Sequence, residues 1–152
     1  MRLWHKDLIK ILPTKQLISQ WRECCCIAKN ISANGTPNHL LVNKIMDYPV
    51  IHFVKYTNLV VSEMKRRGYK VNEEKFYNYL FPNGFPVGYD IERLKKEAAL
   101  IPYDKLYKEW HTAKYFIQCY YNLSEKFDCG GIPANEWSII ESEHLRLLNL
   151  EK

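Results

Sequence analysis

Apolar residues recur at helical spacing along this sequence, and that pattern limits the possible folds more than any other feature. Within residues 15–29, Leu17, Trp21, Cys24 and Ala28 fall on one face of a helix with 3.6 residues per turn. The alternation of apolar and polar residues that is typical of a strand is weak throughout the chain. We therefore predict an all-α fold whose first convincing helix covers residues 15–29.

Capping and turn residues divide the rest of the sequence into further helices. Thr14 is a suitable N-cap for the first helix, and Gly68 follows the basic last turn of a second helix at residues 50–67. The remaining expected elements follow a capping residue or begin at a proline: a short helix after Asn72 that runs through Tyr79, a helix after Asp90, a long aromatic segment at 102–127 and a last helix at 133–148. With 152 residues and no repeat or long linker, the chain is predicted to form a single compact multi-helix domain spanning 1–152.

The sequence carries no signal for a membrane or for secretion. No apolar run approaches the about 18 residues needed to span a bilayer, and charges and a proline interrupt residues 1–15. We expect a cytoplasmic monomer with no membrane partner.

The five cysteines do not form a metal-binding pattern. Cys24, Cys25 and Cys26 are adjacent on a predicted helix, so their side chains diverge by about 100° per residue and cannot converge on one ion. Cys119 and Cys129 lack the short ligand pairs that are typical of zinc sites. We expect no metal, and we interpret these thiols as small buried hydrophobes.

Positive charge is concentrated in the N-terminal half. Residues 1–70 carry a net charge of +8, whereas residues 71–152 carry −3. A polyanion partner and a chance excess of solvated lysines explain this asymmetry about equally well. Lys15, Arg22 and Lys29 also recur every seven residues, so they form a basic line along the first helix that could face phosphates.

Glu23 interrupts this basic surface. On a helical projection it lies well away from the apolar stripe, while Arg22 flanks the stripe on the other side. For an arbitrary pair, both residues would be solvated surface charges. A single carboxylate among phosphate-binding cations repels the ligand, however, so its presence is explained better by chemistry on a nucleic acid.

Four segments, in this order and spacing, allow a comparison with a known family. They are MRLW at residues 1–4, QWRE at 20–23, NHLLVNKIMDYP at 38–49 and EMKRRGYKV at 63–71. Together they resemble the pyrimidine-dimer DNA glycosylase family, of the phage endonuclease V type and its short bacterial relatives. The resemblance covers about the first half of the chain.

The resemblance implies a small all-helical enzyme that is both a DNA glycosylase and an abasic-site lyase, without a metal or organic cofactor. In such enzymes the N-terminal amine attacks the sugar of the lesion and forms a Schiff base, and a glutamate assists. The matching residues here are Met1 and Glu23. The phage type exposes a small residue after losing its initiator methionine, whereas Arg2 follows Met1 in this chain, so Met1 itself is expected to supply the amine.

An amine nucleophile suits this reaction without a metal. An α-amine in short peptides titrates near 7.7–8.0, about 2.5 units below lysine, so a useful neutral fraction exists at pH 7. The partner implied is damaged double-stranded DNA, with contacts expected from Arg2, Lys15, Arg22 and Lys29. His39 lies in a matched segment, where it could contact a phosphate or simply begin a loop or helix. His5 could tune the amine or lie on the surface.

Two other classes of function remain open from the sequence. The chain could be a non-catalytic helical module that binds nucleic acid, or a protein-interaction domain whose basic half binds an acidic partner. The sequence does not identify the lesion or what residues 102–152 recognise.

Overall fold

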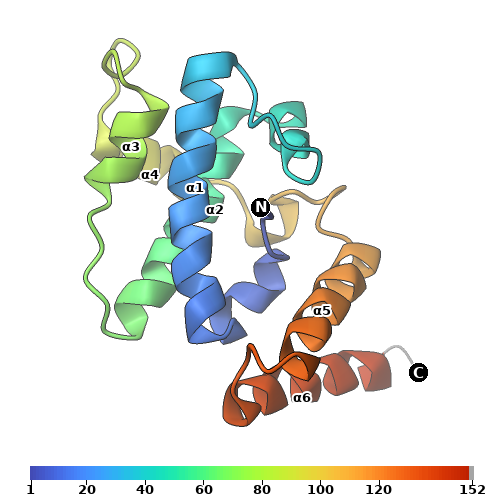
Figure 1. The fold of residues 1–152 in the computed structure, drawn as a ribbon. Coiled ribbons are helices and arrows are strands. Elements are labelled where there is room, and N and C mark those ends of the chain that lie inside the picture. The colour runs from blue at the N-terminus through green and yellow to red at the C-terminus, as the bar shows by residue number, and fades with distance from the viewer. Residues whose placement is uncertain (151–152) are drawn as a thin grey trace.

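Six α-helices and three short 3-10 helices (η) form the structure, and Figure 1 shows their arrangement. The computed structural model describes residues 1–150, and this part of the chain contains no strand. In chain order the elements are η1 (Lys6–Ile11), α1 (Thr14–Asn34), η2 (Asn43–Asp47), α2 (Val50–Arg66), α3 (Glu74–Leu80), α4 (Ile91–Ala99), η3 (Tyr103–Lys105), α5 (Ala113–Asp128) and α6 (Ala134–Leu150). The all-α prediction is confirmed.

Helix α1 is the central element of the fold. It packs against α2 and α3, and α2 packs in turn against α4 (Figure 1). Helices α5 and α6 pack against each other, and α6 also contacts η1. One hydrophobic core runs from Leu3 near the N-terminus to Ile140 in α6, so the described elements form a single compact domain.

The predicted apolar face of α1 is the face that packs. Leu17, Cys24 and Ala28 are fully buried, and Trp21 is partly buried against the same core. The helix extends past the predicted end at residue 29, because no glycine or proline interrupts it before Gly35. Gly35 adopts a φ of 76°, and its N–H donates to the carbonyl of Ile31, which ends the helix.

The predicted N-cap of α1 is wrong. Thr14 already lies inside the helix, and Pro13 precedes it without a capping side chain. The capping group comes instead from α6: the Glu136 carboxylate accepts hydrogen bonds from the Thr14 backbone N–H at 2.7 Å and from its hydroxyl at 3.1 Å. An acidic side chain at a helix N-terminus is favoured by the helix dipole.

The later boundaries follow the predictions with two exceptions. Asp90 caps α4 through the N–H of Arg93, and α2 ends before Gly68, which has a φ of 94°. Asn72 does not cap α3, which begins two residues later at Glu74. The aromatic segment at 102–127 is divided into η3 and α5 by an irregular stretch in which Tyr107 has a φ of 50°.

The cysteines are split between core and surface. Cys24, Cys25 and Cys119 are buried, as predicted, but Cys26 and Cys129 are exposed, so the prediction is wrong for these two. Burial raises the pKa of the Cys25 thiol to about 11 and that of Cys24 further. Among residues 1–150, no helix is long and apolar enough to cross a membrane.

Candidate active site

The N-terminal segment, residues 1–5, lies against α1 and is held by buried side chains. Gln20 makes the central contacts: its amide oxygen accepts from the Trp4 N–H at 2.8 Å, and its amide nitrogen donates to the Arg2 carbonyl at 2.9 Å. Gln20 is fully buried. One side chain of α1 therefore fixes the backbone on both sides of Leu3.

Two tyrosines from other helices fix the next carbonyl groups. The Tyr56 hydroxyl, from α2, donates to the Trp4 carbonyl at 2.5 Å. The Tyr115 hydroxyl, from α5, donates to the Leu3 carbonyl at 2.6 Å. Because three helices hold consecutive residues, the direction in which the chain begins is determined by the packed core.

Lys6 and His111 anchor the end of this segment. The Lys6 N–H donates to Nδ1 of His111 at 2.9 Å, and the Lys6 ammonium donates to the carbonyls of Tyr103 and Leu106, each at 2.7 Å. Lys6 is buried, and this burial lowers the pKa of its amine. With two carbonyls bound to it, the amine has a structural role and does not face the site described next.

Met1, Arg2 and Glu23 meet at one cavity of about 300 Å³. The Glu23 carboxylate accepts a hydrogen bond from the Arg2 backbone N–H, with a distance of 3.4 Å between Oε2 and N. Met1 and Glu23 are both partly exposed, so solvent reaches the cavity. Glu23 thus lies partly accessible to solvent and contacts the N-terminal segment through Arg2.

One face of α5 forms the opposite wall of this cavity. Tyr115, Cys119, Asn122 and Lys126 follow one another at spacings of three or four residues, which places them along one side of the helix. The first two contact the N-terminal segment, since the Arg2 guanidinium lies 3.8 Å from Sγ of Cys119 and above the ring of Tyr115. Asn122 and Lys126 line the cavity itself.

The cavity combines one carboxylate with several cationic groups. Its lining includes Met1, Arg2, Lys126 and Glu23, together with Gln16 and Ser19 of α1. Such a lining suits an anionic ligand that offers a reactive carbon to an amine. The carboxylate is placed to accept a proton or to stabilise positive charge on that ligand.

The other predicted DNA-contacting residues lie outside the cavity. Lys15, Arg22 and Lys29 are exposed on α1, and Arg22 lies about 100° around the helix from Glu23. None of the three takes part in an ion pair within residues 1–149. They form an exposed basic line along α1, and the Lys29 ammonium at its end lies 5.9 Å from the centroid of the Tyr79 ring of α3.

His39 lies in the loop after α1 and is partly exposed. The backbone N–H of His39 donates to the side-chain oxygen of Asn43 at 3.0 Å. The ring Nδ1 of His39 accepts from the backbone N–H of Leu41 at 3.3 Å. The imidazole therefore shapes the loop. Of this loop, Leu41 reaches the cavity lining.

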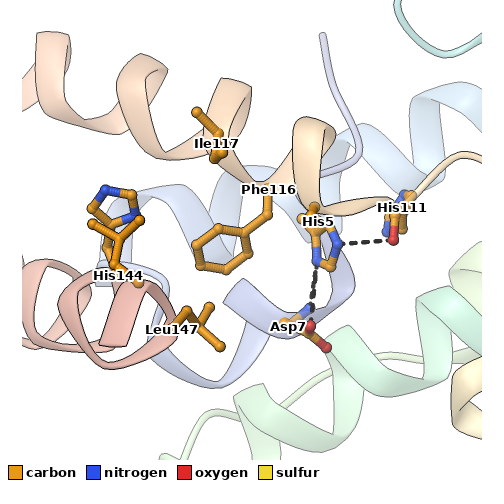
Figure 2. Close-up of a pocket in the computed structure, with 9 residues that line it drawn as sticks. His5, Asp7, His111, Phe116, Ile117, His144 and Leu147 are labelled. Atoms are coloured by element: carbon orange, nitrogen blue, oxygen red, sulfur yellow. Dashed lines mark hydrogen bonds and ion pairs between the residues drawn. The ribbon is translucent and has the colours of Figure 1, made fainter. Parts of the chain in front are cut away.

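His5 lies at a different cavity, of about 220 Å³, between η1, α5 and α6 (Figure 2). It is buried, so a surface position is wrong, and it does not line the Met1 cavity. Its Nδ1 accepts from the Asp7 N–H at 3.1 Å and its Nε2 lies 3.0 Å from the His111 carbonyl. His144 lines the same cavity, but no cluster able to hold a metal is found among the described residues.

Several residues that build the site were missed from the sequence. The side chains that clamp the N-terminus are Gln20, Tyr56, Tyr115 and His111, and those that complete the cavity are Asn122 and Lys126. Only Gln20 could have been suspected from the sequence, because it borders the apolar stripe of α1 and directly precedes the Trp21–Glu23 segment. The others depend on how α2 and α5 pack.

Comparison with known proteins identifies the family of this chain. The family model described as pyrimidine dimer DNA glycosylase matches residues 1–77, which include the N-terminal segment, Gln20 and Glu23. A search of curated proteins and a search of solved structures found no match. Since the family match covers just over half of the 152 residues, the chain belongs to the pyrimidine dimer DNA glycosylase family.

Proposed function

We propose that this protein is a DNA glycosylase and abasic-site lyase that uses the α-amine of Met1 as nucleophile and Glu23 as its assisting carboxylate. The observation that supports this most is the clamp on residues 2–6, because it directs the N-terminus into a polar cavity beside Glu23. Buried backbone groups need hydrogen-bond partners in any protein. Here the same contacts also hold the N-terminus in place before a substrate arrives, as a nucleophile requires.

The proposed reaction begins at C1′ of the damaged nucleotide. The Met1 amine donates its lone pair to C1′, and the glycosidic bond breaks with its electrons leaving on the base, which takes up a proton. The amine loses its protons as the sugar ring opens, so that an imine joins Met1 to the sugar. Loss of a proton from C2′ then expels the 3′ phosphate, and water hydrolyses the imine to restore the amine.

Glu23 has two roles in this scheme. As a carboxylate it stabilises positive charge that develops on the sugar when the base departs. It also accepts protons from the attacking amine and returns them to the leaving oxygen of the opened sugar. Its hydrogen bond from the Arg2 N–H would hold the carboxylate in position during both steps.

The substrate we propose is double-stranded DNA that contains a pyrimidine dimer or a related base lesion. Arg2 and Lys126 would hold phosphates next to the reacting sugar, while Lys15, Arg22 and Lys29 would bind the strand along α1. A damaged base stacks poorly and is therefore easier to displace than a normal pair. We propose that the chain acts as one cytoplasmic, monomeric domain, with no metal or organic cofactor in the reaction.

Borohydride trapping on a duplex with one abasic site tests the proposed function. The untagged protein should form a covalent adduct. In a duplex with one cyclobutane pyrimidine dimer, one glycosidic bond of the dimer should be broken and the strand cut at that site, while the freed base stays joined to its neighbour through the cyclobutane ring. Undamaged duplex is the control. Salt-sensitive binding without an adduct would instead identify a nucleic-acid-binding module, and neither binding nor adduct would identify a protein-interaction domain.

A further inference from the structure

Two adjacent leucines project from the protein at the edge of the candidate active site. Leu40 is 88% exposed and Leu41 is 49% exposed. Leu41 also lines the cavity that holds Met1 and Glu23. A leucine left almost wholly in water beside such a cavity has no role in the core of the described fold.

The loop that carries these leucines is tightly structured. The Asn43 side-chain oxygen accepts from the His39 N–H at 3.0 Å and from the Thr36 hydroxyl at 3.3 Å. The His39 carbonyl accepts from the N–H groups of Val42 and Asn43, at 3.1 and 2.9 Å. Val42 and Ile45 are buried, so the base of the loop is fixed in the core. The leucines are therefore presented in a set direction.

The surroundings of the leucines fit a polyanion that has an apolar interior. Residues 36–46 contain no Asp or Glu, and Lys44 is exposed in the same loop. Arg2 and Lys126 add positive charge at the adjoining cavity. An acidic protein surface would match the charge, but a DNA duplex matches the leucines as well, because its phosphates flank a stack of apolar base faces.

We propose that Leu40 and Leu41 form an apolar wedge that enters the base stack beside the lesion and holds the duplex open while the damaged nucleotide's sugar reaches Met1. This inference rests on the proposed function and assigns the wedge to residues 40–41. Apolar side chains inserted at a base step partly unstack and kink DNA, and the cost of unstacking is a few kcal/mol per step. Leu40 fills the gap that would otherwise collapse or admit water.

The position of the cavity explains why the wedge stands where it does. Leu41 contributes to the cavity wall, and its neighbour Leu40 is almost wholly exposed. A duplex whose phosphates meet Arg2 and Lys126 would bring the base step next to the reacting sugar against Leu40. The wedge and the nucleophile would then act on neighbouring positions of one strand.

Fluorescence of 2-aminopurine, placed next to the lesion analogue in a duplex, measures the proposed unstacking directly. The probe DNA carries a reduced abasic site, which binds without reacting. Wild-type protein should raise the fluorescence, whereas Leu40→Ala should remove most of that rise. Val87→Ala is the matched control, because Val87 is fully exposed in the α3–α4 connection, on the other side of α1 in Figure 1.

Activity on two substrates separates a wedge from a general loss of function. On duplex DNA with an unreduced, reactive abasic site, Leu40→Ala should lower kcat/KM by roughly tenfold, the value expected for one exposed leucine that becomes buried. On single-stranded DNA with the same abasic site the loss should be less than about threefold, because little unstacking is needed there. Circular dichroism should show an unchanged fold.

The outcomes distinguish the wedge from the proposed function. If the wild-type protein forms the borohydride adduct but Leu40→Ala matches it in fluorescence and on duplex DNA, the wedge is wrong and the lyase stands. If wild-type protein forms no adduct but still raises the fluorescence through Leu40, the wedge holds and the lyase is wrong. No fluorescence rise with bound wild-type protein also overturns the wedge.

Discussion

The Glu23 carboxylate lies 3.4 Å from the backbone nitrogen of Arg2. Successive backbone nitrogens are less than about 4 Å apart, as standard bond lengths require, so the α-amine of Met1 is one short step from this contact. Met1 and Glu23 line the same cavity, which has a volume of about 300 Å³. This pairing of a chain terminus with a side chain of α1 is the basis of the proposed chemistry.

Replacing Glu23 by Gln should separate binding from catalysis. The amide keeps the size of the side chain and can still accept a hydrogen bond from the Arg2 N–H, but it carries no charge and cannot take up a proton at neutral pH. Base release should fall by roughly 100- to 10,000-fold, the usual range for loss of a general acid–base group. Binding to lesion DNA should be unchanged or tighter, because phosphate repulsion is reduced. A Glu23→Gln protein with near-normal base release would exclude Glu23 from the reaction.

Replacing Gln20 by Leu should loosen the N-terminal clamp. The Trp4 N–H and the Arg2 carbonyl would be left without partners inside the protein, and each such group costs roughly 1–3 kcal/mol. Denaturant unfolding should show a loss of about 2–6 kcal/mol, and the amount of borohydride adduct should fall in protein that remains folded.

Gln16→Leu is the matched control for stability. Gln16 lies one helical turn earlier on α1, and its buried side-chain oxygen has no hydrogen-bond partner, so the change should cost little or be stabilising. If Gln20→Leu and Gln16→Leu lost the same unfolding free energy, the hydrogen bonds of Gln20 would not be what holds the N-terminus.

Stability should fall in mild acid because two buried histidines act as neutral hydrogen-bond acceptors. Burial and the neighbouring His5 and Lys6 lower the pKa of His111 to about 2, and burial also lowers the pKa of His5. The two histidines bind protons near pH 6.5 in the unfolded chain but stay neutral at that pH in the folded chain. Their contribution to the free energy of unfolding is therefore present above pH 6.5 and is lost as pH falls below it. Each histidine contributes a slope of up to about 1.4 kcal/mol per pH unit.

Unfolding free energy measured between pH 7 and pH 4.5 tests this account. His111→Asn keeps an acceptor for the Lys6 N–H but removes the titrating ring, so its pH dependence should be shallower than that of the wild type. Figure 2 shows His5 and His111 side by side, joined by the contact between the His5 ring and the His111 carbonyl. An unchanged slope in His111→Asn would show that the acid sensitivity comes from other groups.

The sequence predicted the helices better than the caps. The apolar stripe of α1 and the glycine stop at residue 68 are local signals, and both were confirmed. The cap of α1 comes from Glu136, more than a hundred residues away in the chain, and no local pattern could reveal it. Exposure of Cys26 was overlooked although its angle on the helix, beside that of Glu23, places it away from the stripe.

The candidate site likewise has a part that the sequence predicted and a part that depends on tertiary packing. Glu23 and the N-terminus could be paired from the sequence through the family resemblance, but the wall made by Asn122 and Lys126 could not. That wall depends on how α5 packs, and the family match ends before α5 begins. A heptad-like run of Tyr115, Cys119, Asn122 and Lys126 was visible in the sequence, yet only the folded chain shows what it faces.

Removing the charge of Arg22 should weaken DNA binding in a salt-dependent way. Arg22 is exposed on the basic line of α1, so Arg22→Ala should lower the slope of log Kd against log salt by about one, the value for one phosphate contact. Arg146→Ala is a matched control on α6, where the arginine pairs with Glu143. Identical salt slopes for wild type and Arg22→Ala would remove α1 from the DNA-binding surface.

Locating the trapped adduct within the chain tests the central claim most directly. Untagged protein is incubated with abasic-site duplex, and borohydride reduces the imine between them to a stable amine. The adduct is then digested with a protease and mapped by mass spectrometry. We predict that the sugar is attached to the α-amine of Met1, that an N-terminal tag suppresses the adduct, and that Lys126→Arg still forms it. Attachment to a lysine, above all to Lys126 in the same cavity, would contradict the account, even if the protein proves to be a glycosylase.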